Sequence, residues 1–216
     1  MSALVVSANE IDALAKKAAK GAGMPWGLAA DAGKATRWLA DHGLPGPAVL
    51  LDLLDWRDGR SADAVAPPDV SLAWAGHAPV LDAVVVGTVC ADLAGRSAAG
   101  PAELGTVRCP LLLGFAVAVV ARHTGVGLVA SWDDAAVGVG TVAVAVRGAT
   151  ADLCVAEAAV TLRPGPLPGE PLPAAGHGCP VDAGVWARLE HYAARTHAPD
   201  TEQSRLTGAG AGLIDD

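Results

Sequence analysis

The chain has 216 residues, of which 52% are hydrophobic and 18% are charged, and its formal net charge is −8. This apolar content excludes global disorder, and a chain of this length can bury a substantial core. The acidic balance, with only four lysines, argues against nucleic-acid partners and against binding to an anionic membrane surface.

No targeting or membrane-spanning pattern is evident. The sequence begins without the basic region and apolar run of a signal peptide. The longest apolar run, Pro110–Ala121, has twelve residues, whereas a transmembrane helix needs about 20. The four cysteines, at positions 90, 109, 154 and 179, form no CxxC pair, and the chain is not a small one. Both observations favour reduced, mostly buried thiols over disulfides. We therefore expect a cytoplasmic protein.

Three helices are predicted in the first 56 residues. Ser7 and Glu10 have the spacing of a capping box, which marks the start of the first helix. The apolar spacing predicts two further helices, over residues 26–42 and 48–56. Residues 57–69 follow as a linker, which is either a loop or a domain boundary.

The middle of the chain is expected to be mainly a sheet. Val80–Ala94 fits a helix or a strand, and the alanine and aspartate residues within positions 91–94 favour the helix. β-Branched residues predominate from Pro110 onward. The predicted strands are apolar stretches bounded by glycine or acidic turns, namely Leu111–Val120, Gly127–Trp132, Gly140–Arg147 and Asp152–Leu162. Their connections are too short for crossover helices, so the strands are expected to be antiparallel.

A proline- and glycine-rich loop, Arg163–Pro180, precedes a final helix that Asp182 caps. Together these elements predict a single α+β domain with an N-terminal helical cluster, a central antiparallel sheet, and a C-terminal helix with a glycine-rich tail. The expected boundaries are 1–56 for the helical cluster, 70–162 for the mostly β part and 181–216 for the helix and tail.

Nucleotide and metal motifs are weak in this sequence. Gly125–Ala130 and Gly138–Ala143 match a loose GxGxxA pattern, but valine-rich stretches follow the glycines where a dinucleotide site needs a helix. His177 and Cys179 lack a second pair of metal ligands. A metal site would have to be assembled by the fold from residues such as Cys109, His123 and His177. We expect no cofactor and no metal.

Several residues are catalytic or pocket candidates. Cys109 follows Arg108, and a neighbouring cation lowers the pKa of a thiol and favours the nucleophilic thiolate; inert packing is the alternative. Asp133 lies at a turn between strands. It would act there as a general base or would hold a ligand, and an ordinary solvated turn residue is the alternative. Trp132 beside it is expected at the rim of the sheet, where it would line a pocket, and His123 is a further candidate.

The strongest group of candidates follows Asp182. Arg188, His191 and Arg195 share one face of the final helix and would make it cationic. Converging arginines and close backbone approach at glycines suit a small-molecule anion, such as a carboxylate or phosphate. The residues expected to bind it are Arg195, Ser204, Arg205, Gly208 and Gly210, with Ser204 also a catalytic candidate. A solvated helix face and an ordinary chain end are the alternatives.

Both ends of the chain resemble a bacterial protein family of unknown function. The resemblance rests on Asn9–Gly23, Trp26-Gly27, Gly33-Lys34, Arg37–Leu39, His42-Gly43, Arg195-Thr196, Ser204-Arg205 and Gly208–Gly212. It implies a stand-alone cytoplasmic bacterial protein of about this length, and it makes the glycine tail part of the domain. Because the family has no assigned activity, the resemblance supplies no catalytic residues.

The sequence therefore favours a small-molecule enzyme, or an enzyme subunit, that acts on a polar anionic metabolite. One alternative is a non-catalytic subunit or interaction protein whose glycine-rich tail docks into a partner. Another alternative is a small-ligand binding module. A homo-oligomer or a complex with a partner subunit is compatible with each of these functions.

Overall fold

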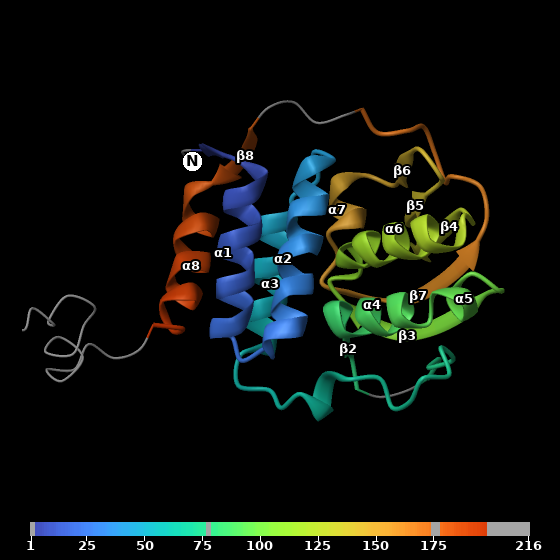
Figure 1. Cartoon of the computed structure of the whole chain (residues 1–216), viewed down its shortest axis with the longest axis horizontal. Coiled ribbons are helices and arrows are strands. Elements are labelled where there is room, and N and C mark those ends of the chain that lie inside the picture. The colour runs from blue at the N-terminus through green and yellow to red at the C-terminus, as the bar shows by residue number, and fades with distance from the viewer. Residues whose placement is uncertain (1–2, 77–78, 174–177, 198–216) are drawn as a thin grey trace, which may run out of the picture.

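The computed structural model describes residues 3–76, 79–173 and 178–197. Two groups of elements lie side by side, with four helices at one side and a six-stranded sheet with its covering helices at the other (Figure 1). Buried residues from both groups form a continuous hydrophobic core. The α+β fold class expected from the sequence is confirmed.

The four-helix group joins the two ends of the described chain. It consists of α1 (Ala8–Gly21), α2 (Trp26–Asp41), α3 (Gly46–Arg57) and α8 (Ala183–Ala194). The three N-terminal helices and the final helix were all predicted. The capping box is present, because Ser7 Oγ accepts from Glu10 N at 3.2 Å and Glu10 Oε2 accepts from Ser7 N at 2.8 Å. Asp182 caps α8 through the backbone N–H groups of Gly184 and Val185.

A two-stranded sheet that was not predicted holds the start of α1 beside the start of α8. Strand β1 (Ala3–Val6) pairs antiparallel with β8 (Cys179–Asp182), with Val6 opposite Cys179. Cys179 and Val181 are buried with Ile11 and Ala40 in a small second cluster. This pairing explains how an element from the far end of the chain becomes part of the N-terminal helical cluster.

The main sheet has six strands in the order β2-β3-β7-β4-β5-β6. Its members are β2 (Leu81–Asp82), β3 (Ala102–Arg108), β4 (Leu128–Trp132), β5 (Ala135–Val139), β6 (Val144–Arg147) and β7 (Glu157–Pro164). Strands β2 and β3 are parallel, and the other neighbouring pairs are antiparallel. The all-antiparallel sheet expected from the sequence is therefore wrong at one edge, where α4 (Ala83–Asp92) and α5 (Ala94–Ser97) form a crossover connection.

The predicted strand Leu111–Val120 is instead helical. Residues Pro110–Leu112 form a 3-10 turn, η2, and α6 continues over Leu113–Thr124. The buried side chains of α6 recur at helical spacing, at 113, 116, 117, 120 and 121, Gly114 is buried as well, and the helix packs on β4 and β5. β-Branched residues favour strands only on average, and here tertiary packing overrides that preference.

The other strand predictions were partly correct. Gly127–Trp132 contains β4, whereas only the second half of Gly140–Arg147 is a strand. Asp152–Leu162 begins in a short helix, α7 (Thr150–Leu153), and continues as β7. Strands β2, β3 and β5 were not predicted, and the linker contains the short 3-10 helix η1 (Asp63–Val65). Residues 70–162 therefore alternate helices and strands instead of being mostly β.

Small residues bring the two groups of elements together. A Cβ atom on Gly114 of α6 would lie 2.5 Å from Cζ3 of Trp38 in α2, so glycine lets the indole pack directly on the α6 backbone. Helix α2 also contacts α4, which extends the same junction. In the part of the chain that the structure describes, no helix is long and apolar enough to span a membrane.

Candidate functional site

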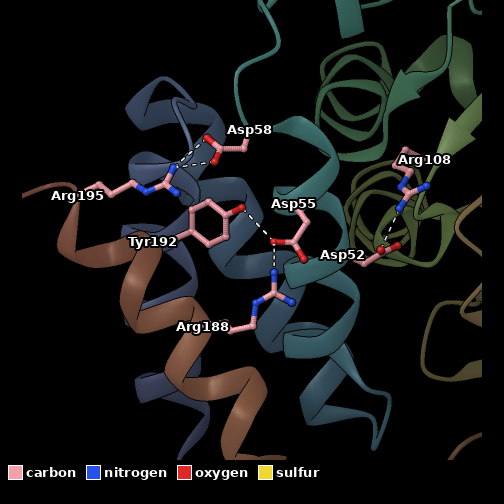
Figure 2. Close-up of polar contacts among 7 residues, drawn as sticks. All are labelled: Asp52, Asp55, Asp58, Arg108, Arg188, Tyr192 and Arg195. Carbon is pink, nitrogen blue, oxygen red and sulfur yellow. Dashed lines mark hydrogen bonds and ion pairs between the residues drawn. The ribbon is translucent and has the colours of Figure 1, made fainter.

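Helix α3 and the residue directly after it carry a row of three carboxylates at the junction between the helices and the sheet. Asp52, Asp55 and Asp58 follow one another at intervals of three residues, which places them along one side of the helix. Each carboxylate binds a different arginine: Arg108 at the end of β3, Arg188 in α8, and Arg195 directly after α8 (Figure 2).

The cationic face of α8 is neutralised inside the chain. Arg188 Nη2 lies 2.6 Å from Asp55 Oδ1, and Arg195 Nη1 lies 2.8 and 2.9 Å from the two oxygens of Asp58. The Tyr192 hydroxyl also donates to Asp55, at 3.0 Å. Arg188 and Arg195 are therefore each paired with a carboxylate, which offsets the positive charge that would otherwise attract an anion.

Tyr192 stays protonated throughout the neutral range. Burial and the hydrogen bond to Asp55 raise its pKa to about 12, with Asp58 acting in the same direction. The phenol is thus a permanent hydrogen-bond donor between α8 and α3. These contacts give Arg188, Tyr192 and Arg195 a clear structural role, which is to attach α8 to the acidic row.

At the other end of the row, Asp52 binds two residues from the end of β3. Arg108 Nη2 donates to Asp52 Oδ1 at 2.9 Å, and the Cys109 thiol donates to Asp52 Oδ2 at 3.2 Å. The Asp52 side chain is nevertheless 47% exposed, whereas that of Arg108 is 17% exposed. Arg108 Nε is buried and has no hydrogen-bond partner among the described residues. One carboxylate is thus held firmly while part of it still faces solvent.

Cys109 is a protonated thiol, not the reactive thiolate expected beside Arg108. Burial is the largest cause of its raised pKa, and the Asp52 carboxylate, which accepts the thiol proton's hydrogen bond, adds to it. Arg108 acts in the opposite direction but is outweighed, because its own charge is paired with Asp52. The prediction of an activated nucleophile is therefore wrong on electrostatic grounds.

The backbone at Cys109 is in an unusual conformation. Its φ angle is +53°, in the left-handed region that non-glycine residues rarely adopt. Its N–H donates to the carbonyl of Ala156 at 2.8 Å, which anchors this conformation where β3 ends and η2 begins. Residues held in such conformations cluster at functional sites, so Cys109 remains of interest as a positioning residue.

A buried ion pair supports the site from behind. Arg57, the last residue of α3, binds Asp82, and their side chains are only 2% and 0% exposed. Asp82 lies opposite Arg108 in the parallel β2–β3 pair and caps α4 through Val84 N at 2.7 Å. Helix α3 is therefore connected to the ends of both parallel strands, through Asp52 to β3 and through Arg57 to β2.

Asp52 lines one of two neighbouring cavities. The first, of about 220 Å³, is lined by Asp52, Cys109, Cys154, Val155, Val49, Pro45 and Ala48. The second, of about 370 Å³, shares Pro45 and Ala48 and extends toward β8 and the start of α8, where Cys179, Asp182 and Val185 line it. Apart from Asp52, the walls of the first cavity are apolar side chains and two thiols.

The remaining sequence-predicted residues lie apart from Asp52. Trp132 is buried, and its Nε1 donates to the carbonyl of Asp152 at 3.0 Å, so it belongs to the core and not to a pocket rim as expected. Asp133 is an exposed turn residue with φ +43°, between β4 and β5. His123 is exposed near the end of α6. Cys109 precedes the start of this helix, so about 15 Å of helix separates the two residues. These two residues therefore cannot share a metal ion.

Four of the expected ligand-binding residues, Ser204, Arg205, Gly208 and Gly210, lie outside the described residues, as does His177. Sequence reasoning overlooked Asp52, Asp55 and Asp58. Their signal was available, because an aspartate recurs at every third position along and just past a predicted helix. Such a row normally indicates a solvated face, and only the fold brings arginines from β3 and α8 to meet it.

We expect thiol reagents to modify Cys154 in the native protein before Cys109, because Cys154 is only partly buried. Replacing Asp52 with asparagine removes the negative charge beside Cys109. The pKa of Cys109 should then fall, and its alkylation at fixed pH should become faster. Iodoacetamide labelling followed by mass spectrometry would measure both rates. The exposed Asp63, replaced in the same way, is the control, and an unchanged Cys109 rate in Asp52→Asn would contradict this electrostatic account.

Residues 6–78 match the model of a family described as "Protein of unknown function (DUF3726)". The match includes α1, α2 and α3, and therefore Asp52, Asp55 and Asp58. The resemblance to a family of unknown function is confirmed for this N-terminal part of the chain. No curated protein and no solved structure matches the chain.

Proposed function

We propose that this protein binds a small molecule in the cavity beside Asp52, and that the molecule carries a protonated amine or another strong N–H donor on an apolar body. The observation that supports the proposal is a half-exposed carboxylate at the wall of an otherwise apolar cavity. Ligand sites commonly combine apolar walls with a few oriented polar groups.

The hydrogen bonds of Asp52 favour a donor as its ligand. Arg108 and Cys109 each occupy one site on a different carboxylate oxygen. An ionised carboxylate offers about four acceptor sites, so each oxygen retains acceptor capacity. The net charge of −8 would also attract a cation more readily than an anion.

The apolar part of the ligand would lie against Pro45, Ala48 and Val49, and a longer molecule would extend into the larger cavity. Asp52 would also be the group to accept a proton if the bound molecule were turned over, which would make the protein an enzyme. The anionic metabolite expected from the sequence depends on Ser204 and Arg205, which are outside the described residues, and on arginines of α8 that are paired.

A thermal-shift series would test this proposal. Primary amines with four to eight carbons would be compared with alcohols and carboxylates of the same carbon skeleton. A ligand at ten times its Kd adds about 1.4 kcal/mol of stability, which corresponds to a rise of about 3–6 °C in the melting temperature of a chain of this size. We expect this rise for the amines alone.

Two variants would locate the binding. Asp52→Asn should remove the thermal shift, whereas Asp63→Asn should retain it. Ala48→Phe adds bulk at an exposed position that lines both cavities, so it should block binding with little effect on the core. Equal shifts with the carboxylates, or a full amine shift in Ala48→Phe, would reject the site.

A further inference from the structure

Three of the four lysines of this acidic chain lie on α1, at positions 16, 17 and 20. Lys16 and Lys20 share one face, and their ammonium groups lie 5.9 and 5.6 Å from the ring centroid of Trp26, the first residue of α2. None of the ion pairs among the described residues includes either lysine. We call Lys16, Lys20 and Trp26 the Lys–Trp patch.

The indole of the Lys–Trp patch is open to a partner. Trp26 is 56% exposed, which is unusual for so large an apolar side chain. Gly23 and Gly27, on either side of it in the sequence, have no other heavy atoms within 4 Å of where a Cβ would be. A ring flanked by two ammonium groups would accommodate an apolar side chain and carboxylates that lie next to it.

The described chain ends close to this patch. Helix α8 packs on the end of α1, since a Cβ on Gly21 would lie 1.8 Å from the carbonyl oxygen of Tyr192 and 3.5 Å from Cβ of Arg195. Figure 1 shows α1 and α8 ending at the same side of the four-helix group. Arg195, two residues before the end of the described chain, therefore lies beside Gly21, the neighbour of Lys20.

The sequence beyond His197 has the complementary chemistry. Residues 213–216 read Leu-Ile-Asp-Asp, which places two apolar side chains directly before two carboxylates. Fifteen residues, 198–212, lie between His197 and this segment, and an extended chain spans about 3.3–3.6 Å per residue. A segment of about 50 Å is much longer than α1, which measures about 21 Å. Reach is therefore sufficient.

We propose that residues 213–216 bind the Lys–Trp patch of the same chain, with Leu213 and Ile214 against Trp26 and with Asp215 and Asp216 paired with Lys16 and Lys20. The charges are complementary, and the glycines at 208, 210 and 212 would let the preceding backbone lie close to a surface. The expected interaction is weakened by salt, because exposed ion pairs are screened.

Carbodiimide cross-linking of the full chain would test the contact, since this reagent joins a lysine to a carboxylate only when the two are adjacent. Mass spectrometry should find Asp215 or Asp216 joined to Lys16 or Lys20 several-fold more often than to Lys34, an exposed lysine on α2 that pairs with Asp31. Trp26→Ala leaves every reacting group in place and should reduce the yield several-fold.

The outcome is decided by three comparisons. Equal coupling to Lys34, or a yield that Trp26→Ala does not change, would reject the patch as the binding site. Cross-links found only in covalent dimers would reject binding within one chain, because they would assign the segment to a second copy. Products of monomer mass that are lost at high salt would support the proposal.

Discussion

Replacing Arg57 with methionine should destabilise the protein by about 3–5 kcal/mol, because it leaves Asp82 as an unpaired buried charge. The two side chains are almost fully buried, and burial already raises the pKa of Asp82 while Arg57 opposes that rise. Without the guanidinium, the pKa of Asp82 should rise further. Urea denaturation would measure the change in the free energy of unfolding.

The pH dependence of this variant has a defined sign. A carboxyl whose pKa is higher in the folded than in the unfolded state binds more protons when folded, so its folded state gains stability as pH falls. The deficit of Arg57→Met should therefore shrink in acid. Arg60→Met, at an exposed position three residues beyond the end of α3, is the matched control and should change stability by less than about 1 kcal/mol. Equal effects of the two substitutions would contradict a structural role for the buried pair.

Replacing Gly21 with alanine should displace α8 from α1. The added Cβ would be 1.8 Å from the backbone oxygen of Tyr192, a distance that neither helix can accept without moving. Overpacking of this kind costs about 1–3 kcal/mol, and the buried Leu189 and Tyr192 would lose part of their contacts as well. Hydrogen exchange should show reduced protection across α8 together with a lower free energy of unfolding.

Gly27→Ala is the matched control for Gly21→Ala. Gly27 is also helical, but no other heavy atom lies within 4 Å of the position of its Cβ. Alanine is favoured over glycine in a helix by about 0.5–1 kcal/mol, so this substitution should be neutral or stabilising. If Gly21→Ala behaved in the same way, the close packing of α8 on α1 would be refuted.

The helices with clear end signals were predictable from the sequence. Ser7 and Glu10 cap the start of α1, and Asp182 caps the start of α8 through the N–H groups of Gly184 and Val185. Both caps are formed by residues that are close together in the chain. Their hydrogen bonds depend on local geometry and need no distant partner. Helices α1 and α8 were accordingly located from their caps, whereas α2, α3 and α4 were located from apolar spacing and composition.

Secondary structure was predicted wrongly where a stretch of sequence is uniformly apolar. The stretch Leu111–Val120 is apolar throughout, so its periodicity distinguishes poorly between a buried strand and a buried helix. The contacts of Gly114 with Trp38, and of α6 with β4 and β5, decide for the helix. Strand β1 was also missed, because its partner β8 lies more than 170 residues away along the chain.

The sequence predicted the candidate site only in part, because the charges around Cys109 come from residues far apart in the chain. The sequence places Arg108 next to Cys109 and so predicts a lowered thiol pKa. In the fold, Asp52 approaches both residues, which neutralises the arginine and raises the pKa of the thiol instead. A charge effect depends on the nearest partners in space, and Asp52 is 57 residues from Cys109 in the sequence.

The sequence by itself determined the acidic, apolar character of this protein, its capped helices and its α+β class, because composition, helix caps and apolar spacing are local properties. Only the tertiary structure decided which charges are paired. It paired Asp55 and Asp58 with the arginines once expected to bind an anion, and it left the Asp52 carboxylate half exposed beside a cavity. Ion pairing and cavity walls are set by distances between residues far apart in the chain, which a sequence alone does not contain.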